Sequence, residues 1–235
     1  MRLRMPKPLH GWRAFVGEVS IIVLGVLIAL AFGAIVDDFK WRIAVSEART
    51  QLRYEVGLNL AFLDNRILGQ RCVKRRLNEL AVVITRASKT GRLPPLGGIG
   101  RAEVYTWPTS VWETEIAAQT MTHFPSGQSA AISRAYRLIS FVHQSNDAEA
   151  AAWLTLSAMT GPGRPVDAAS LSRLIEALGV ARRSNAYLNF QKQLINKIIF
   201  DGGLGKDFPQ LDPSNPPKLS PISICDPIGG PAATY

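Results

Sequence analysis

The chain has 235 residues, 47% of them hydrophobic, and a formal net charge of +9. This length allows one domain with its own core, or one membrane segment plus a domain of about 150 to 190 residues. Apolar residues outside the opening stretch recur at helical spacing, so the composition indicates one membrane segment and not several. The positive charge suits an anionic lipid surface, an acidic polymer or nucleic acid. Because no helix-turn-helix, zinc-finger or RNA-binding signature accompanies it, we do not expect a nucleic-acid partner.

The first predicted element is a membrane-spanning helix at residues 15–36. No charged residue occurs from Val19 to Val36. At about 1.5 Å per residue, a helix over 15–36 is roughly 30 Å long, which matches the hydrocarbon core of a bilayer. Ala29-Leu-Ala31 also fits a signal-peptidase site, so release of a secreted soluble protein by cleavage after Ala31 is the alternative. The apolar run continues past Ala31, which favours an uncleaved anchor.

The basic tail at residues 1–14, with four Lys or Arg residues, determines the predicted orientation. Long C-terminal domains cross the membrane largely regardless of charge, so the short basic tail should stay in the cytoplasm. We therefore expect residues 37–200 to form an extracytoplasmic domain, which is periplasmic if the cell is a Gram-negative bacterium. The predicted location is the bacterial inner membrane.

Small residues recur on one face of the predicted span. Gly25, Ala29 and Gly33 are four residues apart, and Glu18 lies seven residues before Gly25 on the same face. Such a face lets a second backbone approach closely, and a carboxylate near lipid usually meets protein or water. One interpretation is a helix–helix face that binds a second copy or another membrane helix. The other is that Glu18 reaches the headgroups and the glycines are ordinary residues of a membrane helix.

The residues around the span follow a recognisable pattern: Trp12-Arg-x-Phe15-x-Gly-Glu18, "IIVLGVLIALAFG", Trp41-Arg42, and an amphipathic stretch with Glu55 and Asn59. Over roughly residues 11 to 80, this pattern resembles a family of bacterial single-span membrane proteins. Members have an N-terminal Gly-Val/Ile-Leu-Ile-Ala-Leu transmembrane helix and a C-terminal α-helical domain of unknown function. The resemblance implies an envelope protein, and it brings no activity, catalytic residue or cofactor.

Behind the span, the proline-free sequence predicts a stalk helix that continues the span and stops at Gly91. Its apolar residues fit heptad positions: Val45, Leu52, Val56, Leu63, Val73, Leu77, Leu80 and Ile84. Four polar residues interrupt this seam: Arg49, Asn59, Arg66 and Gln70. The interruptions favour packing against the rest of the domain over an extended two-stranded coil. Gly57 and Gly69 weaken the helix locally.

Further helices are predicted after a Gly/Pro-rich linker. Ser110-Val-Trp-Glu113 is typical of a capping box and predicts a helix to about Met121. The next helices are expected to begin at Pro125-Ser126, at Asn146 or Asp147, and after the capping residue Asp167, the last one running to about Phe200. No stretch predicts a strand ladder.

The expected fold is therefore all-α. An N-terminal transmembrane helix continues into the stalk and packs in a bundle of about four to five helices. A Gly/Pro-rich, irregular C-terminal tail occupies residues 201–235.

The two cysteines are Cys72 and Cys225. If the domain is exported to an oxidising compartment, they can form one disulfide that ties the tail to the stalk. Two unpaired thiols are the alternative. Neither cysteine has a partner at metal-ligand spacing, so no metal site is expected.

The sequence contains no catalytic or cofactor-binding motif, and its histidines are scattered. We therefore expect no cofactor and no enzyme activity, with an unrecognised envelope enzyme as an alternative. The candidate basic surface consists of Arg66, Arg71, Lys74, Arg75 and Arg76. It suits anionic lipid or cell-wall polymer, or it is a solvated helix face partly paired with Glu79. The predicted role is binding, scaffolding or assembly.

Overall fold

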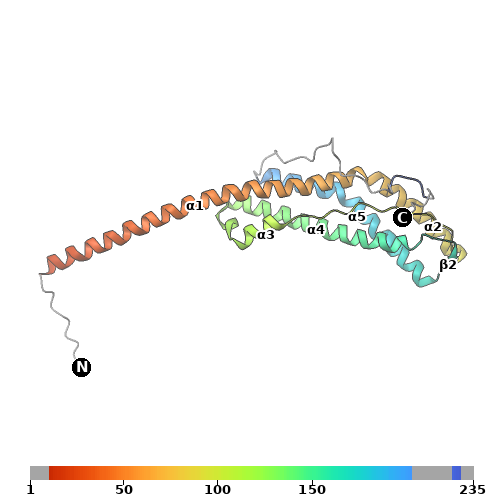
Figure 1. The fold of residues 1–235 in the computed structure, drawn as a ribbon, viewed down its shortest axis with the longest axis horizontal. Coiled ribbons are helices and arrows are strands. Elements are labelled where there is room, and N and C mark those ends of the chain that lie inside the picture. The colour runs from red at the N-terminus through yellow and green to blue at the C-terminus, as the bar shows by residue number, and fades with distance from the viewer. Residues whose placement is uncertain (1–10, 203–223, 229–235) are drawn as a thin grey trace, which may run out of the picture. The chain divides into compact units, whose positions relative to one another are not determined.

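The computed structural model describes residues 11–202 and 224–228 (Figure 1). Within these ranges, five α-helices and one 3-10 helix account for most of the chain, and each of the two strands has two residues. The elements in chain order are α1 (Trp12–Leu68), α2 (Gln70–Thr90), β1 (Arg92–Leu93), α3 (Ser110–Ala117), η1 (Thr120–His123), α4 (Ser126–Ser157), β2 (Arg164–Pro165) and α5 (Ala168–Asp201). The all-α prediction, with four to five helices, is confirmed.

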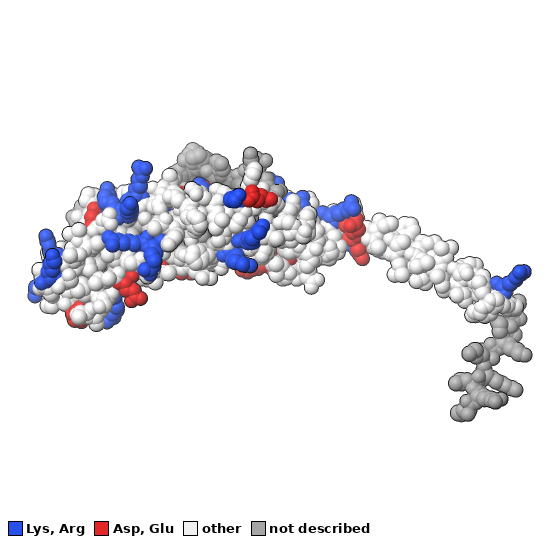
Figure 2. Space-filling view, turned by 180° about the vertical axis from the view of Figure 1, so that it is seen from behind, with Lys and Arg blue, Asp and Glu red and all other residues white. Residues whose placement is uncertain are grey.

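The chain divides into two compact units, Met1–Ala48 and Arg49–Tyr235. Apart from Gly11, the described part of the first unit belongs to α1, and every residue from 19 to 36 is exposed. By length and composition, α1 can cross a membrane, and no other described helix can. In the space-filling view of Figure 2, this stretch is white between charged side chains at its two ends.

The second unit is a helical bundle. The helices α4 and α5 form an antiparallel pair, and α2 packs on α5 (Figure 1). A two-residue antiparallel pairing of β1 with β2 joins the connectors at one end. Seven of the eight predicted seam residues are buried, and Val45 is half-buried. The main core cluster adds apolar residues of later segments to those of α2: Leu93, Ile99, Ala102, Ala152, Trp153, Leu156, Met159, Leu174, Ala177, Leu178 and Ala181.

The predicted single stalk helix is interrupted at Gly69. The helix α1 ends at Leu68 and α2 begins at Gln70, because Gly69 adopts φ −78° and ψ −7°, away from the ideal helical values. Glycine is a weak helix former, which makes this position the easiest one to bend. The predicted stop is confirmed at Gly91: its N–H donates to Ala87 O at 2.9 Å, and its φ of +66° turns the following chain out of the helix.

The predicted helix at Ser110 is confirmed, but its cap residue and end differ from the prediction, and the predicted start at Asn146 or Asp147 is wrong. The cap position of α3 is Thr109 rather than Ser110, and the Thr109 hydroxyl donates to the Glu113 carboxylate at 2.7 Å. The helix also ends at Ala117, before a separate 3-10 turn. No new helix begins at Asn146 or Asp147, because residues 128–157 contain no glycine or proline and α4 runs through them.

The predicted cap of the last helix is confirmed. The carboxylate of Asp167 accepts a hydrogen bond from Ser170 N at 2.6 Å, and this bond lowers the pKa of Asp167. The helix α5 ends at Asp201, close to the predicted end. Most of the predicted basic tail at 1–14 and of the predicted C-terminal tail at 201–235 lies outside the described residues.

Candidate functional site

The predicted basic surface divides into an exposed part and a buried part. Arg71, Lys74 and Arg75 are exposed on α2. With Asn78, Glu79 and Val82 they line an open groove. Arg66 and Arg76 are only 3% and 1% exposed, so the prediction of a single five-residue surface is wrong for these two. Periodicity could not separate them, because each lies close along the chain to an exposed cation.

Arg76 is a buried cation with three acceptors. Its Nε donates to Glu79 Oε2 at 2.9 Å, and its two terminal nitrogens donate to the backbone carbonyls of Ile99 and Asp226. A buried guanidinium is tolerable when its donors are satisfied in this way. Arg76 therefore joins α2, the connector before α3 and the C-terminal segment.

The C-terminal segment 224–228 is attached to α2. The sulfur atoms of Cys72 and Cys225 are 2.05 Å apart in a disulfide, the pairing expected from the sequence if the domain is exported. Arg75 donates to the carbonyl of Cys225, and Ile224 packs against the main core cluster. Gly100 has φ +64°, and a Cβ atom there would meet Ile224 Cα at 3.4 Å. The segment is thus held by covalent, polar and apolar contacts.

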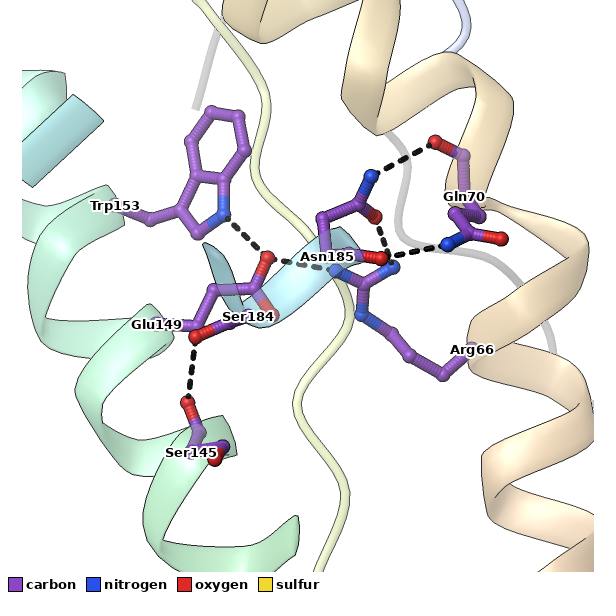
Figure 3. Close-up of polar contacts among 7 residues, drawn as sticks. All are labelled: Arg66, Gln70, Ser145, Glu149, Trp153, Ser184 and Asn185. Atoms are coloured by element: carbon purple, nitrogen blue, oxygen red, sulfur yellow. Dashed lines mark hydrogen bonds and ion pairs between the residues drawn. The ribbon is translucent and has the colours of Figure 1, made fainter. Parts of the chain in front are cut away.

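The second buried cation, Arg66 of α1, lies in a polar cluster inside the bundle (Figure 3). Its Nη2 is 2.6 Å from Oε1 of Glu149 on α4, and both side chains are buried. The same carboxylate oxygen accepts from Trp153 Nε1 at 3.3 Å. Burial raises the pKa of Glu149, and this effect exceeds the opposing effects of Arg66 and Trp153.

The same cluster fixes the break between α1 and α2. The side chain of Gln70, the first residue of α2, donates to the Asn185 carbonyl at 2.6 Å, and Asn185 Nδ2 donates to Gln70 O at 3.3 Å (Figure 3). Arg66 Nη1 donates to Asn185 Oδ1 at 3.4 Å. Polar contacts to α5 therefore flank Gly69 on both sides.

A second buried carboxylate, Glu55 of α1, accepts from neutral donors. The backbone N–H groups of Val111 and Trp112 donate to it at 2.8 and 3.2 Å, at the start of α3. The hydroxyls of Ser110 and Tyr136 donate to it at 3.3 and 2.6 Å. Burial and this bond raise the pKa of the Tyr136 phenol, which therefore remains a donor at neutral pH. Glu55 thus caps α3 from another helix.

The predicted face of the apolar stretch is exposed along α1. Glu18, Gly25, Ala29 and Gly33 are all exposed. A Cβ atom added at Gly25 or at Gly33 would meet no atom within 4 Å, so the helix surface is open there. Association through this face stays a prediction.

The described histidines form no catalytic arrangement. His143 pairs with Asp147 at 3.4 Å on the exposed side of α4, and His123 ends the 3-10 helix η1. Among residues 11–202 and 224–228, no three His, Cys, Asp or Glu side chains gather closely enough to hold a metal ion.

Together these features define a helical-bundle protein with one helix that is long and apolar enough to span a membrane. No protein-family model, no curated protein and no solved structure matches this chain. The predicted resemblance to the bacterial single-span family therefore stays an expectation.

Proposed function

We propose that this chain is a single-pass protein of the bacterial inner membrane. In this proposal the N-terminus is cytoplasmic, the helical bundle is periplasmic, and the bundle binds or assembles with partners rather than catalysing a reaction. The main support is the exposure of all 18 residues from Val19 to Val36, none of them charged. An apolar surface of this size is unfavourable in water and is stable in lipid.

We propose an uncleaved anchor in place of a cleaved signal, because the apolar stretch continues past Ala31 to Val36. Ala31 lies inside α1, which continues as a regular helix to Leu68. A cleavage site instead follows a shorter apolar region. The secreted product released after Ala31 is the alternative that a test must address.

Within the membrane, we propose that Glu18, Gly25, Ala29 and Gly33 form the face on which a second helix packs. Small side chains allow close backbone contact, and a partner helix can give Glu18 a hydrogen-bond donor or cation. A second copy of the chain is the simplest partner, and another membrane helix is the alternative.

Outside the membrane, we propose that the groove of Arg71, Lys74 and Arg75 binds anionic lipid headgroups or cell-wall polymer. The groove has one acidic residue, Glu79, whose carboxylate already contacts Arg76 at 2.9 Å and Arg75 at 3.8 Å. Arg71 and Lys74 are not paired with Glu79 and therefore remain accessible to an anion.

Fractionation of cells expressing a C-terminally tagged chain tests the anchor. We expect the intact mass in the carbonate-resistant membrane pellet, and digestion of the bundle by protease once the outer membrane is opened. Ala31→Leu, which removes the small residue required for cleavage, should leave the mass unchanged. A shorter soluble product from the wild type that becomes full-length in Ala31→Leu would show that the stretch is a cleaved signal.

A membrane two-hybrid reporter tests the helix–helix face. Gly25→Leu with Ala29→Leu should weaken self-association, because the added side chains separate the backbones. Ala31→Leu with Ala34→Leu adds the same two leucines away from this face and should have little effect. Equal signals from both variants would remove the proposed face.

A further inference from the structure

A small cavity lies in the bundle interior beside the Arg66–Glu149 pair. Its lining comes from four segments: Arg66 of α1, Trp107 of the connector before α3, Asn146 and Glu149 of α4, and Gln191 of α5. The cavity has room for about one water-sized molecule. It is therefore too small for an organic ligand.

Three N–H donors of the residues that line this cavity have no acceptor. They are Arg66 Nε, Trp107 Nε1 and Asn146 Nδ2, and each of these atoms is inaccessible to solvent. The three residues are only 3%, 5% and 8% exposed. Donors cannot satisfy one another, and native proteins rarely leave buried polar groups unpaired. The cavity therefore needs a hydrogen-bond acceptor.

We infer that the cavity binds a single buried water molecule. Water can accept two N–H bonds and donate two, so it suits a cavity whose lining includes both N–H donors and the Glu149 carboxylate. The charge of Arg66 is already balanced by Glu149 at 2.6 Å, so a halide would add an uncompensated negative charge. A halide is also larger than water.

This water joins segments that are distant in sequence. By accepting from Trp107 and Asn146 it bridges the connector and α4 at a point where apolar side chains would otherwise form the core. Its presence accounts for a polar Asn146 at a buried position of α4 and for the buried indole N–H of Trp107 without a protein acceptor.

Nuclear magnetic resonance of the full chain in detergent micelles, with ¹⁵N only in the tryptophan indoles, tests this inference. The five tryptophans give five indole signals, and Trp107→Phe identifies the one from Trp107. We expect slow hydrogen exchange at Trp107 and a cross-peak to water that has opposite signs in NOE and ROE spectra, which is the signature of a long-lived bound water. Trp153 is the internal control, because its Nε1 bonds directly to Glu149 at 3.3 Å.

A second variant and a salt series distinguish a bound water from a protein acceptor and from a halide. Asn146→Leu removes one donor to the water and should weaken the Trp107 cross-peak. A protected Trp107 signal without any water cross-peak would overturn the inference in favour of a direct protein acceptor, such as a rotated Asn146 amide. A cross-peak of the same sign in both spectra would overturn it in favour of exchange with bulk solvent. A chemical shift of the Trp107 indole that changes when chloride replaces gluconate at constant ionic strength would identify a halide instead.

Discussion

Glu55 and Glu149 are two carboxylates buried in the same bundle, and their partners differ in kind. Glu55 accepts from two backbone N–H groups at the start of α3 and from two hydroxyls, all of them neutral. Glu149 instead pairs with the guanidinium of Arg66. Glu55 is therefore held by neutral donors, and Glu149 by an opposite charge.

This difference determines what each carboxylate requires from its surroundings. The first four N–H groups of α3 lack acceptors within the helix whether or not Glu55 is present, so the Glu55 carboxylate supplies acceptors for this helix end. Arg66 and Glu149 were both removed from water, and each is tolerable only because the other is there. Removing one partner of the Arg66–Glu149 pair should therefore destabilise the fold more than removing Glu55 from the start of α3.

Arg66→Met is expected to have the largest effect. It leaves Glu149 without its cation in the bundle interior, and removal of one partner from a buried pair costs about 3 to 5 kcal/mol. Urea unfolding of the full chain in detergent, followed by tryptophan fluorescence, measures the change. Arg71→Met is the matched control from the exposed part of the basic run, and it should change stability by less than about 0.5 kcal/mol.

The double variant Arg66→Met with Glu149→Leu should recover part of the loss, because it removes the unpaired charge. Equal losses in Arg66→Met and Arg71→Met would contradict the distinction between the buried and the exposed cations.

Arg76, the buried cation of α2, has one of its three acceptors in the disulfide-linked segment. Cys225→Ser together with Cys72→Ser frees the segment that gives Arg76 its Asp226 acceptor. A disulfide closing a long loop typically contributes about 2 to 4 kcal/mol. We expect a lower urea midpoint in the double variant, and a similar midpoint for the wild type after reduction. An unchanged midpoint in both cases would mean that segment 224–228 adds nothing to the stability of the bundle.

The sequence predicted the helical elements well because apolar periodicity and strong end signals define them. The heptad seam, the stop at Gly91 and the cap at Asp167 depend on local chemistry that one short window contains. The helix at Ser110 was predicted, although its cap is Thr109, whereas the start at Asn146 was wrong because asparagine also occurs outside caps. At Asn146, tertiary contacts bury a polar residue that looked like a helix start.

The polar clusters could be predicted only in part. Asn59, Arg66 and Gln70 interrupt the apolar seam, and this was a signal that they face the interior. Arg66 bonds to Glu149 and Asn185. Both are more than 80 residues away from it along the chain, and no local pattern connects them. The prediction of the basic surface was wrong for Arg66 and Arg76 for a related reason. A run of cations does not reveal which of them the fold buries.

Glu55→Gln tests the other carboxylate. The side chain keeps its size but has one acceptor oxygen instead of two, so an N–H of α3 or the Tyr136 hydroxyl loses its partner. Hydrogen bonds to charged groups contribute about 1.5 to 3 kcal/mol, and we expect a loss near the lower end of that range. Urea unfolding measures it. A loss larger than that of Arg66→Met would reverse the order proposed for the two carboxylates.

The pH dependence of Glu149 gives the subtlest comparison. Burial raises the pKa of Glu149 above its ordinary 4.5, so the folded chain binds this proton more tightly than the unfolded chain does. Between the two pKa values the folded state carries more protons, and the free energy of unfolding therefore falls as pH rises through that window. Below pH 4.5 the group no longer contributes a slope.

Glu149→Gln cannot titrate and should lack this component of the pH dependence. The difference between the wild-type and Glu149→Gln unfolding free energies should therefore change as pH rises above about 4.5 and then level off. Glu176→Gln on the exposed side of α5 is the control, and its curve should run parallel to that of the wild type in the same range. Parallel curves for all three proteins would contradict the raised pKa of Glu149 and would show that Arg66 compensates fully for its burial.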